Sequence, residues 1–209
     1  IDSGGIDLDS YKPEELKVRF DFDSTKQGEV ILKPTLSYGD YSFQPVEDEK
    51  LPRTVCRDVP GEFRISQLIT RYFKYKEYET EYPIIKDDED AVYHLLKDGM
   101  QEFMDQGDVY LSDSFRKLKI LPSPKVNIGV RSSGNWLELQ VDTEGMTETE
   151  LSSLLAEYKQ KKSYYRLKNG EFLSLDDNGL ITVAKLLDGL ALTKAELESK
   201  TFRLPAYRA

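Results

Sequence analysis

The chain has 209 residues, of which 39% are hydrophobic and 11% aromatic, and this composition is typical of a folded protein with a sizeable core. It carries 29 basic and 38 acidic residues, a net charge of −9 that argues against a general polyanion-binding protein. The acidic excess lies in residues 1–124, so any attraction for nucleic acid has to be local and in residues 125–209.

The first elements are predicted to be strands. Alternation predicts a strand over Leu16–Asp23, with its apolar side chains on one face, and a partner strand that begins after the turn at Gln27-Gly28. Tyr-Gly-Asp-Tyr within residues 36–46 indicates another turn between short strands. The polar segment Glu47–Pro60 is predicted to be a loop.

Two helices are predicted next. Gly61–Tyr82 has apolar residues at helical spacing and a tyrosine series within it: Tyr72, Tyr75, Tyr78 and Tyr82. The tyrosines suit either a stacking platform for bases or a core stripe, and the shared surface with Ile69 and Phe73 favours the core. Asp87 is expected to cap a second helix, whose first turn would hold the acids of DDED.

A short strand is predicted at Val109–Leu111, and Pro122 and Pro124 then give the clearest linker signal in the chain. We therefore expect two subdomains, an acidic one at 1–122 and a second one at 125–209. The second opens with a hairpin predicted over 125–142. Trp136 lies on its polar face and suits either an exposed contact or cross-strand packing.

The remaining elements are a capped helix, a second hairpin and two further helices. Thr147 and Glu150 form a capping box, which predicts a helix with an apolar stripe. Asn169-Gly170 predicts a hairpin over 163–176 with a two-residue turn. Further helices are expected over Leu180–Leu187, with Asp176-Asp177 as its cap, and after Thr193. The pattern is α+β, with antiparallel hairpins and packed helices.

The 163–176 hairpin and the residues before it carry the chain's most basic stretch, KKSYYRLKNGEFLSLDD. A two-residue turn would place Lys168 opposite Glu171 and Leu167 opposite Phe172, and Lys161 and Lys162 would end the preceding helix, where cations are favourable. Local structure thus accounts for most of the charge. If DNA binds here, the candidate contacts are Lys161, Lys162 and Arg166.

No catalytic or metal-binding motif is apparent. His94 is the single histidine, and Cys56 is the single cysteine, which excludes an intramolecular disulfide and a four-ligand zinc site of Cys and His. Neither GxxxxGK[ST] nor GxGxxG occurs, and the acidic run at Asp87 lacks the glycine of an EF-hand loop. No apolar run approaches membrane-spanning length.

Several stretches resemble a known family. GNWLELQVDTEGMTETEL, KKSYYRLKNGEFLSLDD and the terminal FRLPAYRA, in this order, resemble the helicase-associated domain of bacterial Swi/Snf-family (Snf-two type) ATPases. YGDYSFQPV, the Arg57-Asp58 step and DVYLSDSF resemble the same domain more loosely. The resemblance thus extends over most of the chain and is strongest over Gly134–Ala209.

This resemblance implies a setting for the chain. The domain would lie N-terminal to a two-lobed motor that hydrolyses ATP and moves on double-stranded DNA in the cytoplasm, near the nucleoid. It would be an accessory, non-catalytic part that modulates the motor or its engagement of DNA or partners. Catalytic residues and cofactors would belong to the motor, which would use ATP and Mg²⁺. The alternative is a protein-interaction module without nucleic-acid contact, which the net charge favours.

Overall fold

The computed structural model describes residues 15–45, 55–77, 81–123, 125–143, 147–175, 185, 189 and 201–205. The chain divides into two compact units, Ile1–Leu118 and Lys119–Ala209. The fold is mixed α+β with mostly antiparallel strands, which confirms the predicted class. That the two units fold as separate domains stays a prediction.

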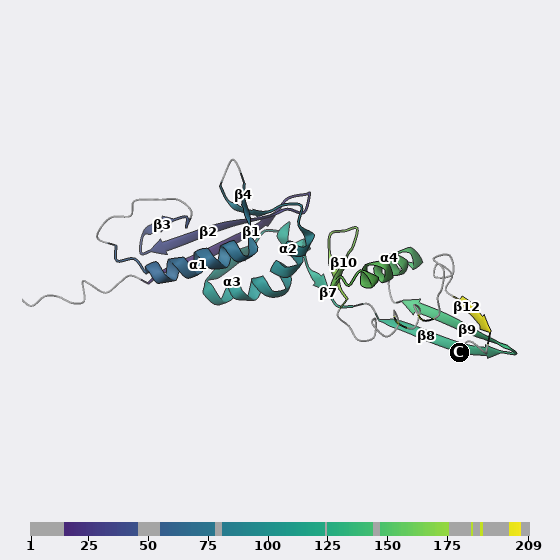
Figure 1. The fold of residues 1–209 in the computed structure, drawn as a ribbon. Coiled ribbons are helices and arrows are strands. Elements are labelled where there is room, and N and C mark those ends of the chain that lie inside the picture. Colours follow the sequence, from purple (N-terminus) through teal and green to yellow (C-terminus); the bar gives the residue numbers. More distant parts are fainter. Residues whose placement is uncertain are drawn as a thin grey trace, which may run out of the picture. The chain divides into compact units, whose positions relative to one another are not determined.

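The first unit is built on a six-stranded sheet (Figure 1). Its strands are β1 (Lys17–Ser24), β2 (Val30–Tyr38), β3 (Tyr41–Phe43), β4 (Tyr75–Lys76), β5 (Pro83–Ile85) and β6 (Asp108–Leu111). Their order is β4-β5-β2-β1-β6, and β3 pairs with β2. The β1–β2 pairing and the Gly39–Asp40 turn follow the predicted pattern, whereas β6 runs parallel to β1, which the sequence did not indicate.

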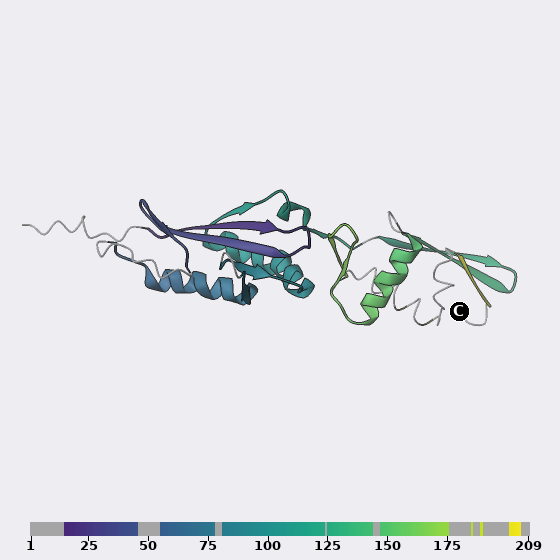
Figure 2. The same ribbon diagram turned by 90° about the horizontal axis from the view of Figure 1, so that it is seen from above.

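Helices cover one face of this sheet (Figure 2). They are α1 (Val59–Tyr72), α2 (Glu89–His94), a π-helical turn (Leu95–Gly99), α3 (Met100–Gln106) and a 3₁₀ turn (Phe115–Lys117). The core is aromatic, because Phe103 of α3 packs edge-on against Phe20 and Phe22 of β1, with ring centroids 4.9 and 5.1 Å apart.

Two helix predictions need correction. α1 ends at Tyr72 rather than Tyr82, and Tyr75 lies in β4, so a tyrosine platform along one helix does not form. Tyr78 lies outside the described residues. The α2 cap is Asp88, whose carboxylate accepts from the Ala91 N–H at 2.9 Å. Asp87 has a left-handed φ of 52° instead of the extended backbone that is typical of a cap residue.

In its described residues, the second unit contains two three-stranded sheets and the helix α4, and Lys185 and Gly189 are also helical. The first sheet has the order β10-β11-β7, formed by Tyr164–Arg166, Phe172–Ser174 and Ile120–Leu121. The second has the order β12-β9-β8, formed by Thr201–Pro205, Trp136–Thr143 and Val126–Ser133. The pairing of β7 with β11 places residues 120–121 in this unit, although the predicted boundary assigned them to the first.

The capping box predicted at Thr147 is confirmed at the start of α4 (Glu148–Lys159). The Thr147 N–H donates to Glu150 Oε2 at 3.0 Å, and the Glu150 N–H donates to Thr147 Oγ1 at 3.3 Å. These bonds hold the pKa of Glu150 below its usual value. The expected Asp176-Asp177 cap, the helix over 180–187 and the helix after Thr193 fall largely or wholly outside the described residues.

Candidate nucleic-acid interface

Of the three candidate DNA-contacting residues, Lys161 and Lys162 lie between α4 and β10, and Arg166 is the last residue of β10. Lys161 follows the helix with a left-handed φ of 61°. The Lys162 N–H donates to the Glu157 carbonyl at 3.3 Å, which is the 6→1 bond of a Schellman motif. Lys161 thus occupies the left-handed position after the helix, where glycine is most common. The helix end therefore sets the backbone of both lysines without a ligand.

The charged groups of Lys162 and Arg166 interact with side chains of the same unit. The Lys162 ammonium lies 2.6 Å from the Glu157 carboxylate, and the Arg166 guanidinium lies 5.4 Å from the ring centroid of Phe172. Lys161 is exposed. The structure therefore brings the three residues into one short segment, but Lys162 and Arg166 make contacts within the unit.

The β10–β11 hairpin is shifted by one residue from the predicted register. The Leu167 N–H donates to the Glu171 carbonyl at 2.8 Å, and the Gly170 N–H donates to the Leu167 carbonyl at 2.9 Å. Three residues therefore form the loop, and Gly170 has the left-handed φ of 91° that closes a type I turn with a bulge. The predicted opposition of Lys168 to Glu171 is wrong.

This shift exchanges the faces of the hairpin, as any one-residue slip must. Leu173 and Leu175 pack on Leu154 of α4, beside Tyr165 and Leu167. Phe172, predicted opposite Leu167, lies instead opposite Arg166. Its ring meets Tyr164 edge-on, with centroids 5.3 Å apart. Packing on both faces selects this register.

Glu171 is held by Lys119 and Asn169 rather than by Lys168. The Lys119 Nζ lies 3.0 Å from Glu171 Oε1, and Asn169 Nδ2 donates to Oε2 at 2.7 Å. The bond to Lys119, followed by that to Asn169, lowers the pKa of Glu171. Lys119 directly precedes β7, so its ion pair with Glu171 links the hairpin loop to the start of β7.

The first unit contains a part-buried polar cluster that the sequence did not reveal. The Tyr38 hydroxyl donates to Glu62 Oε1 at 2.8 Å and accepts from the Asp58 N–H at 2.7 Å. Arg57 binds both oxygens of Glu62, at 2.9 and 2.5 Å. The Arg57 bonds lower the pKa of Glu62, whereas burial and the Glu62 bond raise that of Tyr38 to about 12.

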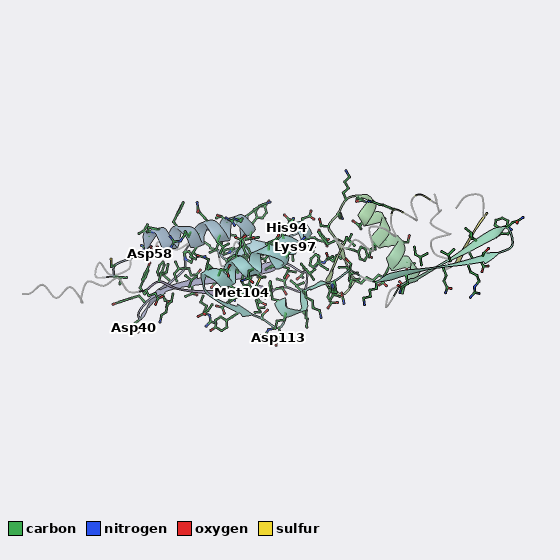
Figure 3. All side chains as sticks on the ribbon, turned by 90° about the horizontal axis from the view of Figure 1, so that it is seen from below. Asp40, Asp58, His94, Lys97, Met104 and Asp113 are labelled. Atoms are coloured by element: carbon green, nitrogen blue, oxygen red, sulfur yellow. The ribbon has the colours of Figure 1, made fainter. Side chains whose placement is uncertain are left out.

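This cluster joins the end of β2 to the start of α1. Asp58 lies at the start of α1 (Figure 3) and caps the helix, because its carboxylate accepts from the Gly61 N–H at 3.0 Å. Every carboxylate and hydroxyl in it has a partner in the fold, so the arrangement is that of a structural clamp. No sequence motif signals it, because Tyr38 and Glu62 lie 24 residues apart on different elements.

A cavity of about 270 Å³ lies between α1 and α3 and is lined in part by Arg64, Gln67 and Asp105. Arg71 and Glu102 form an ion pair at its wall, and the Tyr72 hydroxyl donates to Glu102 at 2.8 Å. Its charged groups therefore include a cross-helix pair.

His94 and Cys56 are both at the surface. His94 lies on the surface of the first unit (Figure 3). Its side chain is 64% exposed, and its Nδ1 lies 3.8 Å from the Asp98 carboxylate. The described part of the chain holds no group of three or more metal-ligating side chains. Its helices include none that is both long and apolar enough to cross a membrane.

These features define a mixed α+β module whose prominent polar groups engage one another. The family model described as "Bacterial SNF2 helicase associated" matches residues 4–209, and the chain belongs to this family. Comparison with curated proteins finds no match, and neither does comparison with solved structures. The match confirms the resemblance on nearly the whole chain, including the N-terminal part where the motifs are loose.

Proposed function

We propose that this chain is a non-catalytic accessory domain that regulates a bacterial SNF2-type ATPase through contact with the motor protein. It would work in the cytoplasm, near the nucleoid, where such a motor moves on DNA. ATP and Mg²⁺ would be bound by the motor. The family match carries the link to the helicase.

The local charges support contact with protein rather than DNA. A duplex contact needs cationic side chains that can neutralise phosphates and release the counterions condensed on them. In the candidate segment, Lys162 lies beside Glu157, and Arg166 stacks on Phe172. Using either cation on DNA would forfeit a contact that it already makes. The net charge of −9 adds long-range repulsion from a polyanion.

A titration of labelled duplex DNA at several salt concentrations tests this proposal. We expect no salt-dependent binding by the domain, and no difference when Lys161, Lys162 and Arg166 are changed together to Glu. Lys168→Glu, on the same hairpin, is the matched control. Affinity that falls linearly with salt on logarithmic axes and is lost only in the triple variant would establish direct DNA contact instead.

The regulatory part of the proposal needs the motor. DNA-stimulated ATP hydrolysis is compared for the SNF2 ATPase with and without this domain. We expect the domain to change the rate and the triple variant to change it equally. Equal rates with and without the domain would refute a regulatory role.

A further inference from the structure

The hairpin formed by β8 and β9 exposes large apolar side chains on both faces near its turn. Trp136, the first residue of β9, is 50% exposed, and Val130 of β8 is 63% exposed. Trp136 pairs with Ser133 and Val130 with Leu139, so the two side chains leave the ribbon on opposite faces. Trp136 is therefore an exposed residue, as one of the two sequence interpretations held.

Both side chains lie near the closed end of the hairpin. β8 is the edge strand of the order β12-β9-β8, and Gly134 closes the hairpin with a left-handed φ of 63°. Toward the other end of the hairpin, Ile128 is partly buried. Among the hairpin residues whose burial the structure describes, the exposed large apolar side chains are Val130 and Trp136, and both lie toward the turn.

The charges on this ribbon favour a protein partner. Residues 126–143 contain one cation, Arg131, and two carboxylates, Glu138 and Asp142. Arg131 and Glu138 are paired across the strands in register. A nucleic-acid platform combines aromatic side chains with a cationic groove, and this hairpin has no cationic excess. Tryptophan and arginine are instead residue types that dominate the binding energy of protein interfaces.

We propose that the end of the β8–β9 hairpin, with Trp136 and Val130, is the surface that docks on the SNF2 ATPase. This inference rests on the proposed function, because the family's association with the helicase names the partner. The indole would enter an apolar pocket of the motor, and Val130 would contact its rim, so that both faces of the hairpin end become buried on binding.

The chain contains its own reporter, because Trp136 is its single tryptophan. A chain labelled with 5-fluorotryptophan gives one ¹⁹F resonance, and an unlabelled partner adds none. The partner is the SNF2 ATPase of the same bacterium, without this domain where the two are fused. We expect the resonance to shift or broaden on addition of the ATPase and to stay unchanged on addition of duplex or single-stranded DNA.

Variants separate this surface from the rest of the domain. Trp136→Ala and Val130→Ser should each weaken binding of the ATPase about tenfold or more by calorimetry. Gln140→Ala, at an exposed position farther along β9, should bind as the parent chain does. Circular dichroism checks that each variant is folded, and Val130→Ser retains the tryptophan signal.

The outcomes distinguish the two proposals. Suppose that calorimetry shows binding of the ATPase, but the resonance is unchanged and both variants bind as tightly as the parent chain. The hairpin would then not be the docking surface, while the proposed function would still hold. No binding of the ATPase in either measurement would overturn both. A response of the resonance to DNA would replace the protein partner with nucleic acid.

Discussion

Tyr38 and Glu62 share a hydrogen bond of 2.8 Å that joins the last residue of β2 to the first turn of α1. Tyr38 is fully buried, and Glu62 is 9% exposed. The same hydroxyl accepts from the N–H of Asp58, the residue that caps α1. One phenol oxygen therefore holds both the cap residue Asp58 and the first-turn carboxylate Glu62 in place.

Tyr38→Phe should destabilise the first unit by about 1–3 kcal/mol, because the Asp58 N–H and Glu62 each lose a partner while the ring volume is kept. Urea unfolding followed by circular dichroism measures the change. The control is Tyr41→Phe, since Tyr41 is 46% exposed and pairs with Tyr38 across the β2–β3 turn. Equal stability of both variants and the parent would show that the bond contributes nothing.

The pKa shifts predict losses of stability at both ends of the pH range. Arg57 lowers the pKa of Glu62 in the folded state. The contribution of Glu62 to the free energy of unfolding is therefore fully present above about pH 4.5, and it is lost as the pH falls through the pKa of the folded state. The pKa values of Tyr38 and Tyr72 are raised to about 12. The contribution of these hydroxyls to the free energy of unfolding is therefore lost as the pH rises from about 10 to about 12. Melting temperatures across pH measure both losses, and Tyr38→Phe should reduce the alkaline one. An unchanged alkaline slope in that variant would contradict the assignment.

Gly107→Ala should cost about 1–3 kcal/mol in unfolding free energy, because a Cβ there would lie 2.4 Å from the Val18 carbonyl oxygen. Backbone atoms of β1 cannot yield as a side chain would. Gly129→Ala is the control, since its nearest neighbour would be 3.8 Å away, and it should change stability by less than about 0.5 kcal/mol. A fully tolerated Gly107→Ala would mean that α3 does not end so close to β1.

The hairpin register predicts which lysine couples to Glu171. A double-mutant cycle between Lys119→Ala and Glu171→Ala should give a favourable interaction energy, and a cycle between Lys168→Ala and Glu171→Ala should give none. The two cycles share one partner and are matched controls. Coupling to Lys168 alone would restore the two-residue turn.

Lys161→Gly should raise the unfolding free energy by a few tenths to about 1 kcal/mol, because glycine relieves the left-handed strain after α4 at some cost in unfolded-chain entropy. Thermal unfolding measures this gain. The same variant should leave the domain's effect on the ATPase unchanged under the proposed function. A stabilised variant that fails to regulate the motor would indicate that the Lys161 charge is itself used.

Local signals in the sequence predicted most elements. The alternation of Val18, Phe20 and Phe22 and the box of Thr147 and Glu150 each depend on neighbours within a few residues, and both are present as expected. The parallel pairings of β1 with β6 and of β7 with β11 join distant segments, so no local pattern encodes them.

The candidate site was predicted only in part for a similar reason. Asn169-Gly170 indicates a hairpin, but the choice between two and three loop residues depends on packing of Leu173 against α4. The partners of Lys162 and Arg166 depend on that choice and on the helix end. Tyr38 and Glu62 meet only once the sheet and α1 are assembled, which hides the clamp from sequence inspection.

The parallel pairing of β6 with β1 has a consequence for synthesis on the ribosome. The hydrogen bond from Ser112 to Asp23 spans 89 residues of sequence. During translation, β1 therefore lacks its second neighbouring strand, β6, for about 5–20 s at ordinary synthesis rates. An open strand edge of this kind invites pairing with other nascent chains. The outward side chains of β1, Lys17, Arg19, Asp21 and Asp23, are charged and act as gatekeepers during that interval.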